Sequence, residues 1–542
     1  MIASRLWNND RAARAYASGL WIDGTLADSL RTASQRTPQR VLLIDGEHRV
    51  DCQTLQSQAT LLAHAMLARA PMGSVVSFML PNWHEAAVIY LAATLAGMIV
   101  NPILPSLRER ELLFILKDAR TRLIFVPSTF RQHNYIAMMS RVTALLDSSP
   151  EVVVLRGYAG RHTAYESMIQ QAQPSPLPAL DPDAIRMILY TSGTTGRAKG
   201  VLHSHNSIHA LICQIRNHWR VEPGDKFLIP SPIGHIGGSI YAFECPLLLG
   251  TTGVLMDRWN ADDAVKIIDT EGCTHMAGAT PFLEQIVSAA QRAQTHLPSL
   301  KLFVCGGASV PPALIRGAAA HFERAVVTRV YGSTEVPVTT VGSTGPDDTQ
   351  HGADTDGRPG IAEIKLVPHA GTSADRHAQA AVNCEGEILT RGPQMLRGYL
   401  HAEDEADAFD TEGFFKTGDL ARWVDDEYLV VTGRAKDIII RQGENISPKE
   451  IEDILIGHPN IADVAIVGLP DPRTGERACA VIVPRSMPGP DVASLRAFLD
   501  SQGVATFKVP EQVAIWESLP RNDAGKVLKH QIRATLAAMT DR

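Results

Sequence analysis

The sequence has few cysteines and none in a pattern that binds a metal or builds a disulfide framework. Its 542 residues include seven cysteines, an odd number, and no two of them form a C-x-x-C pair. Scattered cysteines are typical of proteins from reducing compartments. We therefore expect free thiols and a cytoplasmic location, with neither a structural zinc site nor a disulfide scaffold.

The sequence also lacks a long hydrophobic run and a large excess of one charge. The longest apolar stretch, residues 86–100, ends at Asn101-Pro102 and is shorter than the roughly 20 residues that cross a bilayer. We expect it to be a buried helix and expect no membrane span. The first residues contain no apolar segment of the kind found in secretory signals. A net charge of −7 argues against nucleic acid as a partner.

Two common catalytic motifs are missing as well. The glycine-rich segment 190–200 does not follow the G-x-x-x-x-G-K-[ST] pattern of a Walker A loop, and no G-x-S-x-G string of an α/β-hydrolase occurs. These absences exclude the P-loop NTPase and hydrolase classes.

The patterns that are present predict an α/β protein with more than one domain. A chain of this length suggests two to four domains. In the first half, helical patterns such as residues 55–70 alternate with β-rich runs at 74–80 and 123–127, which predicts α/β layers with largely parallel sheets. Strand-like runs at 361–367, 386–392 and 428–433 predict a β subdomain. The last hundred residues predict a small α+β domain, with helices at 448–455 and 495–502 and strands at 464–469 and 478–484.

The segment from Tyr190 to Gly200, YTSGTTGRAKG, is the strongest functional feature. It offers unobstructed backbone N–H groups, hydroxyls, and the cations Arg197 and Lys199, all of which suit a polyphosphate. A buried strand precedes it and a helical pattern follows, so we expect a strand-to-helix junction. The alternative is an ordinary polar turn.

This string resembles the phosphate loop of the adenylate-forming superfamily, which includes acyl-CoA synthetases, stand-alone adenylation domains and firefly-type luciferases. Four further segments match the superfamily in the same order: residues 331–335 (YGSTE), 417–419 (TGD), 433–452 and 520–529. The resemblance covers about 520 residues. It implies ATP, Mg²⁺ and coenzyme A as cofactors, and a large N-terminal domain followed by a small, mobile C-terminal domain.

The resemblance also implies roles for individual residues. The phosphate loop would be formed by Thr191, Ser192, Gly193, Thr194, Thr195, Gly196 and Lys199, and the facing wall of the cleft by Gly306, Gly307 and Ala308. Tyr331 and Gly332 would lie at the adenine, and Thr334 would reach the α-phosphate. Glu335, with Thr194, would hold Mg²⁺, in keeping with the preference of this ion for oxygen ligands. Asp419 and Arg434 would bind the ribose.

Three C-terminal residues have implied roles in the change between two half-reactions. Lys436 falls at the hinge, which divides the chain into residues 1–435 and 436–542. Gly443 would line the coenzyme A passage, where a side chain would block the thiol arm; a plain turn glycine is the alternative. Lys526 would bridge the substrate carboxylate and the α-phosphate; a solvated lysine is the alternative.

Residues 235–241 carry the expected acyl pocket. His235 matches the family's gate, although a core histidine remains the alternative. Gly237, Gly238 and Ser239 are small and Ile236 is apolar, as are Ile240 and Tyr241; with Gly307 they predict a pocket for a bulky, uncharged acyl group. No acidic residue is present to hold an α-ammonium group, which disfavours amino acids. The N-terminal half resembles ligases for medium-chain and alicyclic acids, while aryl and short or branched acids remain open.

Three functions fit these features. The first is an ATP-dependent acyl-CoA ligase acting on a small-molecule carboxylic acid. The second is a stand-alone adenylating enzyme that loads a carrier protein, and the third is a non-catalytic nucleotide-binding protein. Lys526, Glu335 and Asp419 are all present, which disfavours the third. A homo-oligomer is compatible with the sequence.

Overall fold

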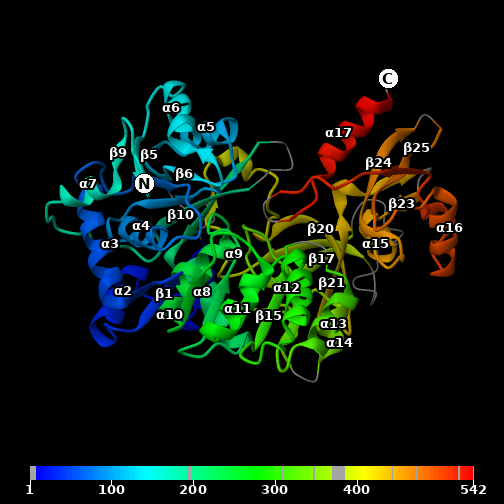
Figure 1. Cartoon of the computed structure of the whole chain (residues 1–542), viewed down its shortest axis with the longest axis horizontal. Coiled ribbons are helices and arrows are strands. Elements are labelled where there is room, and N and C mark those ends of the chain that lie inside the picture. Colours follow the sequence, from blue (N-terminus) through cyan, green and yellow to red (C-terminus); the bar gives the residue numbers. More distant parts are fainter. Residues whose placement is uncertain are drawn as a thin grey trace.

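The computed structural model describes residues 8–191, 197–307, 310–345, 348–368, 385–441, 444–471, 473–522 and 525–540, and only the backbone of residues 444, 445 and 540. The described chain has a large part, residues 8–434, and a small part, residues 439–540, which lies at the right in Figure 1. The large part contains a seven-stranded, an eight-stranded and a four-stranded sheet, and the small part contains a five-stranded sheet.

The seven-stranded sheet is parallel except for its edge strand β2. Its strands, in the order β16-β15-β14-β12-β13-β1-β2, are β1 (Val41–Asp45), β2 (His48–Asp51), β12 (Lys226–Ile229), β13 (Thr252–Leu255), β14 (His275–Gly278), β15 (Leu302–Gly306) and β16 (Val326–Val330). Helices α11 (Ala261–Glu271), α12 (Thr280–Ala293) and α13 (Pro312–His321) connect successive strands from β13 to β16. These connections place the carboxyl ends of the strands at one edge.

The eight-stranded sheet runs in the order β19-β11-β10-β4-β3-β5-β8-β9 and is parallel from β10 to β9. Its strands are β3 (Val75–Phe78), β4 (Ile99–Pro102), β5 (Thr121–Pro127), β8 (Glu151–Leu155), β9 (Thr163–Ala164), β10 (Ile185–Thr191), β11 (Lys199–Ser204) and β19 (Gly398–Tyr399). Helix α4 (His84–Leu95) packs against strands of both sheets, and its residues 86–95 are all buried. The expectation of largely parallel α/β layers is confirmed.

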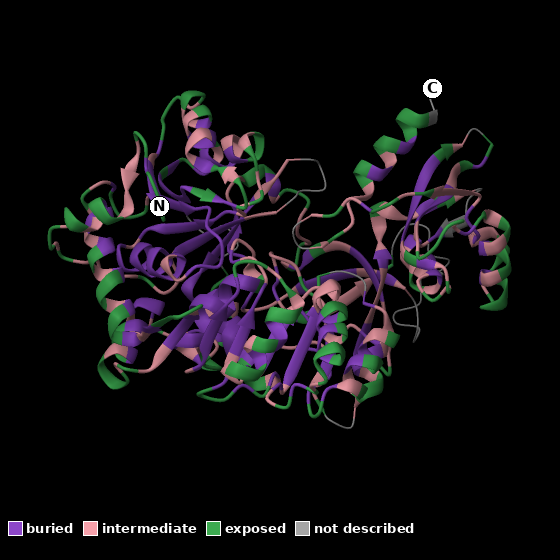
Figure 2. Ribbon diagram, viewed as in Figure 1, coloured by how far each residue is buried: buried purple, intermediate pink, exposed green. Residues whose placement is uncertain are grey.

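The other elements of the large part surround these sheets. They are α1 (Asn9–Ala17), α2 (Leu26–Arg36), α3 (Cys52–Leu67), α5 (Glu109–Asp118), β6 (Thr129–Phe130), β7 (His133–Asn134), α6 (Tyr135–Ala144), α7 (Tyr165–Gln170), α8 (His205–His218), α9 (Ile236–Ser239), the π-helical turn η1 (Ile240–Glu244), α10 (Cys245–Leu248), α14 (Thr349–Asp354) and η2 (Ala402–Asp404). Figure 2 shows that the buried residues concentrate in the strands and in the helices between them.

Two local expectations differ from the structure. The phosphate-loop segment does not join a strand to a helix, because β10 and β11 pair as antiparallel neighbours and α8 begins only at His205. The apolar run 86–100 is not one helix either: α4 ends at Leu95, Gly97 takes φ +64°, and Ile99 starts β4. Within the described residues we find no helix with the length and apolarity that a bilayer crossing requires.

The four-stranded sheet is antiparallel and confirms the β subdomain. Its strands, in the order β17-β18-β20-β21, are β17 (Glu363–Val367), β18 (Gly386–Arg391), β20 (Phe415–Val424) and β21 (Tyr428–Arg434). The short turn η3 (Ala435–Asp437) then leads out of the large part.

The small part is an α+β unit, as expected. Its sheet contains β22 (Ile439–Arg441), β23 (Glu444–Ile446), β24 (Ile461–Asp471), β25 (Gly475–Pro484) and β26 (Gln512–Ile515). One face packs against α15 (Pro448–Leu455) and α16 (Val492–Ser501), and the other against α17 (Lys529–Thr540). A turn, η4 (Thr506–Lys508), precedes β26. The expected helix 448–455 agrees at both ends.

Candidate active site

Several predicted residues meet at the carboxyl edge of the seven-stranded sheet. Gly306 ends β15, Gly307 follows it, and Tyr331 follows β16 directly. The segment that carries His235 follows β12 in the same sheet. Parallel sheets bind ligands at this edge because the loops that leave the strands converge there. The fold thus brings the residues predicted for adenine and for the acyl pocket to the same edge.

Tyr331, Asp419 and Arg434 form one hydrogen-bonded group. The Tyr331 hydroxyl donates to Asp419 Oδ2 at 2.8 Å, and Arg434 Nε lies 2.7 Å from Asp419 Oδ1. Asp419 and Arg434 are register partners on β20 and β21. Burial, together with the Asp419 charge, raises the pKa of Tyr331. Residues 88 positions apart in the sequence therefore form a polar group, with the hydrogen-bond donors and acceptors that ribose hydroxyls need.

Lys526 reaches this group from the small part. Its pKa is lowered to about 8, first because the protein atoms around the cleft remove water and second because Arg434 repels the ammonium. Lys436 adds to the repulsion, and Asp419 opposes it. The Lys526 side chain keeps an exposed surface. The ammonium thus lies within electrostatic reach of Asp419 and Arg434, the predicted ribose residues, and a nearby anion would stabilise its charged form.

The loop that carries Lys526 touches the large part. A methyl group at Gly525 would lie 3.8 Å from Ala279 Cβ and from Pro281 Cγ, at the start of α12. The loop is closed by Lys526 N, which donates to Asn522 Oδ1 at 2.8 Å. The C-terminal loop is therefore seated on the same sheet edge as the other site residues.

The flanks of the phosphate-loop segment carry cations that already have partners. Both Arg197 contacts are to Asp404, at 2.8 Å to each carboxylate oxygen, and Lys199 Nζ lies 3.8 Å from the same carboxylate. Lys199 also lies 5.2 Å from the Tyr399 ring centroid. Thr191 ends β10 at the mouth of the segment. The predicted residues Ser192, Gly193, Thr194, Thr195 and Gly196 lie outside the described residues.

Thr334 and Glu335 accept hydrogen bonds from other segments of the chain. His203 Nε2 donates to the Thr334 carbonyl at 2.8 Å, because a carbonyl oxygen can only accept. Burial lowers the pKa of His203 to about 4. The Tyr399 hydroxyl donates to Glu335 Oε1 at 3.0 Å. Among the described residues, the second carboxylate oxygen of Glu335 has no hydrogen-bond partner, so an oxygen ligand for a hard cation remains.

The glycines of these loops are required by close backbone approach. A Cβ at Gly332 would lie 2.6 Å from Val338 N, and one at Gly306 would lie 2.9 Å from the Val330 carbonyl oxygen. Gly307 has φ +84° and no neighbour within 4 Å of its Cβ position, so it faces open space. Ala308 lies outside the described residues.

In the segment of the expected acyl pocket, Gly237 and Gly238 differ in the space around them. Gly237 is exposed and has no atom within 4 Å of its Cβ position. A Cβ at Gly238 would lie only 2.2 Å from the Pro232 carbonyl oxygen. The idea that Gly238 leaves space for substrate is therefore wrong, because its missing side chain permits backbone packing. Ser239 is buried, and its hydroxyl donates to the Ile236 carbonyl at 3.3 Å.

His235 has a buried ring nitrogen that faces no hydrogen-bond partner among the described residues. Burial lowers the pKa of His235, so its ring is neutral at physiological pH. The partly buried Ile236 follows it at the start of α9. A neutral histidine beside an apolar side chain suits an uncharged acyl group.

Lys436 lies in η3, between the last strand of the four-stranded sheet and the first strand of the small part. Burial lowers the pKa of Lys436, and Arg434 lowers it further. The Lys436 side chain nevertheless keeps an exposed surface. This position is compatible with a hinge, which remains a prediction. Gly443 lies outside the described residues.

Sequence patterns did not identify three supporting residues: His203, Tyr399 and Asp404. Asp404 is 207 positions from Arg197, and Tyr399 is 64 positions from Glu335. For Tyr399 and Asp404, the one local signal is the position of residues 398–405, which follow the phosphate loop and precede the TGD motif. Such contacts depend on the pairing of β19 with β11, which a single sequence does not reveal.

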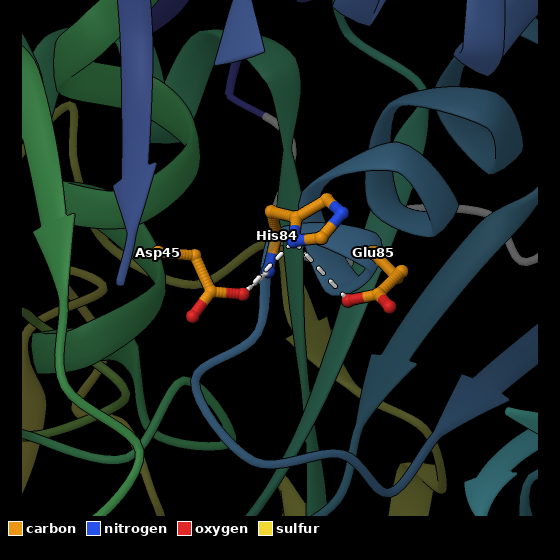
Figure 3. A group of neighbouring side chains, drawn as sticks. All are labelled: Asp45, His84 and Glu85. Atoms are coloured by element: carbon orange, nitrogen blue, oxygen red, sulfur yellow. Dashed lines mark hydrogen bonds and ion pairs between the residues drawn. The ribbon is translucent and has the colours of Figure 1, made fainter. Parts of the chain in front are cut away.

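A second group of potential metal ligands lies outside this site. Asp45, His84 and Glu85 have ligand atoms within 4.8 Å of one another (Figure 3). Arg156 Nη2 lies 2.9 Å from Asp45 Oδ2 and 2.7 Å from Glu85 Oε2. Burial alone would raise the pKa of Asp45. Hydrogen bonds from His84 and Arg156 outweigh burial and hold that pKa below its usual value. The Arg156 guanidinium already supplies the positive charge that a metal ion would bring. The group therefore links β1 to α4 and is not a metal site.

Comparison with known proteins gives two family matches. The AMP-binding enzyme family matches residues 30–400, and the AMP-binding enzyme C-terminal domain matches residues 450–526. The chain is 33% identical to the medium-chain fatty-acid–CoA ligase of Escherichia coli K12, over 97% of this chain and 93% of that protein. It is 32% identical to a salicyl-AMP ligase / salicyl-S-ArCP synthetase of Mycobacterium tuberculosis, over 98% and 94%.

Solved structures share the fold. ATP-bound MatB from Rhodopseudomonas palustris superposes with a TM-score of 0.82 at 25% sequence identity, covering 94% of this chain and 98% of that one. The match extends over both the large and the small part.

Proposed function

The chain belongs to the AMP-binding enzyme family and is an ATP-dependent acid–thiol ligase, and we propose that its acid is neutral and bulky. It activates a carboxylic acid as an acyl adenylate and then forms the thioester with coenzyme A, releasing pyrophosphate and AMP. The observation that carries the assignment of the site is the approach of Lys526 to the Asp419–Arg434 pair.

In the first half-reaction, a carboxylate oxygen attacks the α-phosphorus of ATP, and the bond to pyrophosphate breaks. We assign the ribose to Asp419 and Arg434, and the adenine to Tyr331 and Gly332. Lys526 would lie between the two anions, whose mutual repulsion it offsets. The lowered pKa of Lys526 supports this role, because a nearby anion would stabilise the ammonium that burial and Arg434 destabilise. Positioning and charge neutralisation supply most of the rate.

Mg²⁺ fits the residues present. Glu335 offers carboxylate oxygen, which this ion prefers, and it is fixed by the Tyr399 hydroxyl. We propose that Glu335, with Thr194, holds the ion, which would neutralise phosphate charge. Thr334 would reach the α-phosphate.

In the second half-reaction, we propose that residues 436–542 rotate about Lys436 relative to residues 1–435. The rotation withdraws Lys526 and brings Gly443 to the coenzyme A passage. The thiol sulfur then attacks the acyl carbonyl, the bond to AMP breaks, and the thiol proton goes to solvent. The placement of η3 between two separate sheets supports a hinge there.

The acyl pocket argues for an uncharged acid. Neutral His235, partly buried Ile236, and the open space at Gly237 and Gly307 support this preference. The resemblance to a medium-chain ligase adds medium-chain and alicyclic acids as the first classes to test. The free, buried cysteines among the described residues are in keeping with a cytoplasmic protein.

A substrate panel tests the function directly. Pyrophosphate release is measured for straight-chain, alicyclic, aryl and amino acids, with and without coenzyme A, and the thioester is identified by mass. We expect medium-chain or alicyclic acids to lead and thioester to form. Adenylate formation without thioester would instead support the carrier-protein alternative, which the salicyl-S-ArCP synthetase relative favours.

Two neighbouring glycines provide a matched test of the pocket. Gly237→Phe fills open space and should shift turnover toward shorter acids, with little effect on stability. Gly238→Ala places a Cβ against the Pro232 carbonyl and should lower the melting temperature without changing the order of preferred acids. An unchanged chain-length preference in Gly237→Phe would place the pocket elsewhere.

A further inference from the structure

A cavity of about 260 Å³ lies behind the candidate active site, between α1 and the segment that follows β18. Its walls include Arg11 and Arg14 on α1, Arg391 at the end of β18, and Arg397 just before β19. Trp21 closes one side, with its indole nitrogen donating to the Pro393 carbonyl at 3.0 Å. Three segments distant in sequence thus build one concave surface.

Positive charge dominates this cavity. Four arginines line it against one carboxylate, Glu363. Glu363 is held by Arg391, whose Nη2 lies 2.7 Å away. Arg11 Nη1 donates to a neutral group, the Gly413 carbonyl, at 3.4 Å. The lining residues therefore leave more positive than negative charge.

Arg11 stands at the centre of the group. Burial lowers the pKa of Arg11, and repulsion from Arg391 and Arg14 adds to the effect. Burial lowers the pKa of Arg397 to about 10, against the attraction of Asp183, and Arg11 repels it as well. Arg11 thus lies within electrostatic reach of the other three guanidinium groups. Such mutual repulsion costs folding free energy unless an anion offsets it.

The side chains are also held in place. The Arg397 guanidinium carbon lies 4.9 Å from the Trp21 ring centroid, and that of Arg391 lies 4.2 Å from the Phe414 ring centroid. Guanidinium groups stacked on rings lose less side-chain entropy when they form hydrogen bonds. The cavity is smaller than the range of about 300–1,000 Å³ that drug-sized ligands occupy, so its occupant must be compact.

We propose that this arginine-lined cavity, bounded by Arg11, Arg14, Arg391 and Arg397, is a second anion site that binds a compact phosphate, either pyrophosphate or inorganic phosphate. Phosphate oxygens match the planar fork of guanidinium groups and accept two hydrogen bonds from each. A multivalent anion also offsets the repulsion centred on Arg11. This proposal does not depend on the identity of the acid substrate.

The site is joined to Glu335 through the backbone. Leu396 N donates to the Glu335 carbonyl at 2.7 Å, and Arg397 N donates to the Leu202 carbonyl at 2.7 Å. Both residues line the cavity. An anion bound there would therefore rest against the segment that also holds the candidate magnesium ligand.

Equilibrium dialysis against radiolabelled pyrophosphate, and separately against inorganic phosphate, counts the sites at constant ionic strength. The test variant is Arg11→Gln/Arg14→Gln, and the matched control is Arg31→Gln, an exposed arginine on α2 paired with Asp28. A Lys199→Ala variant identifies any equivalent that belongs to the nucleotide site. We expect the double variant to lose one equivalent, or to bind it about tenfold more weakly, while Arg31→Gln retains it.

The binding of pyrophosphate is compared with that of inorganic phosphate. The anion that binds more tightly is identified as the occupant. If the double variant does not fold, the single variant Arg14→Gln is used, because Arg14 is exposed. It must weaken binding of the same equivalent of phosphate. The proposal is overturned if the wild-type protein shows no equivalent outside the nucleotide site. Equal loss in Arg31→Gln, or unchanged binding in the arginine variants, would overturn it as well.

Discussion

The large and small parts of the molecule bury their apolar residues in different ways. In the large part, the most extensive cluster joins the seven-stranded sheet through α4 to the eight-stranded sheet, and another covers the opposite face of the seven-stranded sheet. In the small part, two separate clusters lie on the opposite faces of a single sheet. The small part therefore has hydrophobic cores of its own, which contain no residue of the large part.

The described contacts between the two parts include a hydrogen bond and a loop that rests on a helix. Ser447 Oγ donates to the Thr432 carbonyl at 2.6 Å, and the Gly525 loop rests on α12. Lys436 and Lys526 both keep exposed surface there. A unit with its own core and a polar boundary can rotate without exposing apolar surface. The difference fits the proposal that the large part holds the nucleotide and that the small part moves Lys526 to and from it.

The largest expected effect comes from removing Lys526. A unit charge about 4 Å from an anion, at an effective dielectric of about 20, is worth roughly 4 kcal/mol before desolvation. Half to all of one such contact corresponds to roughly thirtyfold to a thousandfold in rate. Lys526→Ala should slow adenylation by about two to three orders of magnitude and leave thioester formation from supplied acyl adenylate almost unchanged.

The matched control for this test is Lys508→Ala, another lysine of the small part, which pairs with Glu450. It should leave both half-reactions near wild type. Pyrophosphate exchange measures the first half-reaction, and thioester yield measures the second. If Lys526→Ala slows both steps alike, the delivery of this lysine by the small part is the wrong description.

The next effect concerns rotation. Lys436→Pro removes a backbone donor and fixes φ near −65°, so it should hold the small part in one orientation. We expect thioester formation to slow by about tenfold or more while adenylation survives. Lys436→Ala keeps the backbone free and should resemble wild type in both steps. Equal rates for the two variants would locate the hinge at another residue.

A smaller effect tests whether the two cores are independent. Ile124 in the large part and Ile451 in the small part are both fully buried. Ile→Val at either site should cost about 0.5–1.5 kcal/mol of unfolding free energy. In calorimetry, each substitution should lower only the transition of its own part. A single transition that shifts equally in both variants would contradict the comparison.

The smallest effect is on the pH dependence of adenylation. The pKa of Lys526 is about 8 in the free protein, and the protonated form is the active one. The value of kcat/KM should therefore fall about twofold between pH 7 and pH 8, and more steeply above. Bound nucleotide favours the ammonium, so the fall in kcat should occur at higher pH. Lys526→Ala should lack this limb, and its persistence there would assign it to another group.

The sequence was most informative where local patterns act on their own. Helix 448–455 was predicted at both ends, because Pro448 suits a first turn and the apolar residues Ile451 and Leu455 recur at helical spacing. The parallel sheets followed from the alternation of elements. The helix expected directly after the phosphate loop was wrong, because residues 199–204 pair with β10 before α8 begins. Strand pairing outweighed the local helical pattern there.

The sequence by itself determined the family, the order of the motifs and the identity of the chemical groups, because these depend on residue types and spacing. Only the tertiary structure decided that Tyr331, Asp419 and Arg434 form one group with Lys526 beside it. It also separated Gly237, which faces open space, from Gly238, which packs on the Pro232 carbonyl. Contacts between residues far apart in the chain depend on sheet order and packing, and neither is encoded in any single segment.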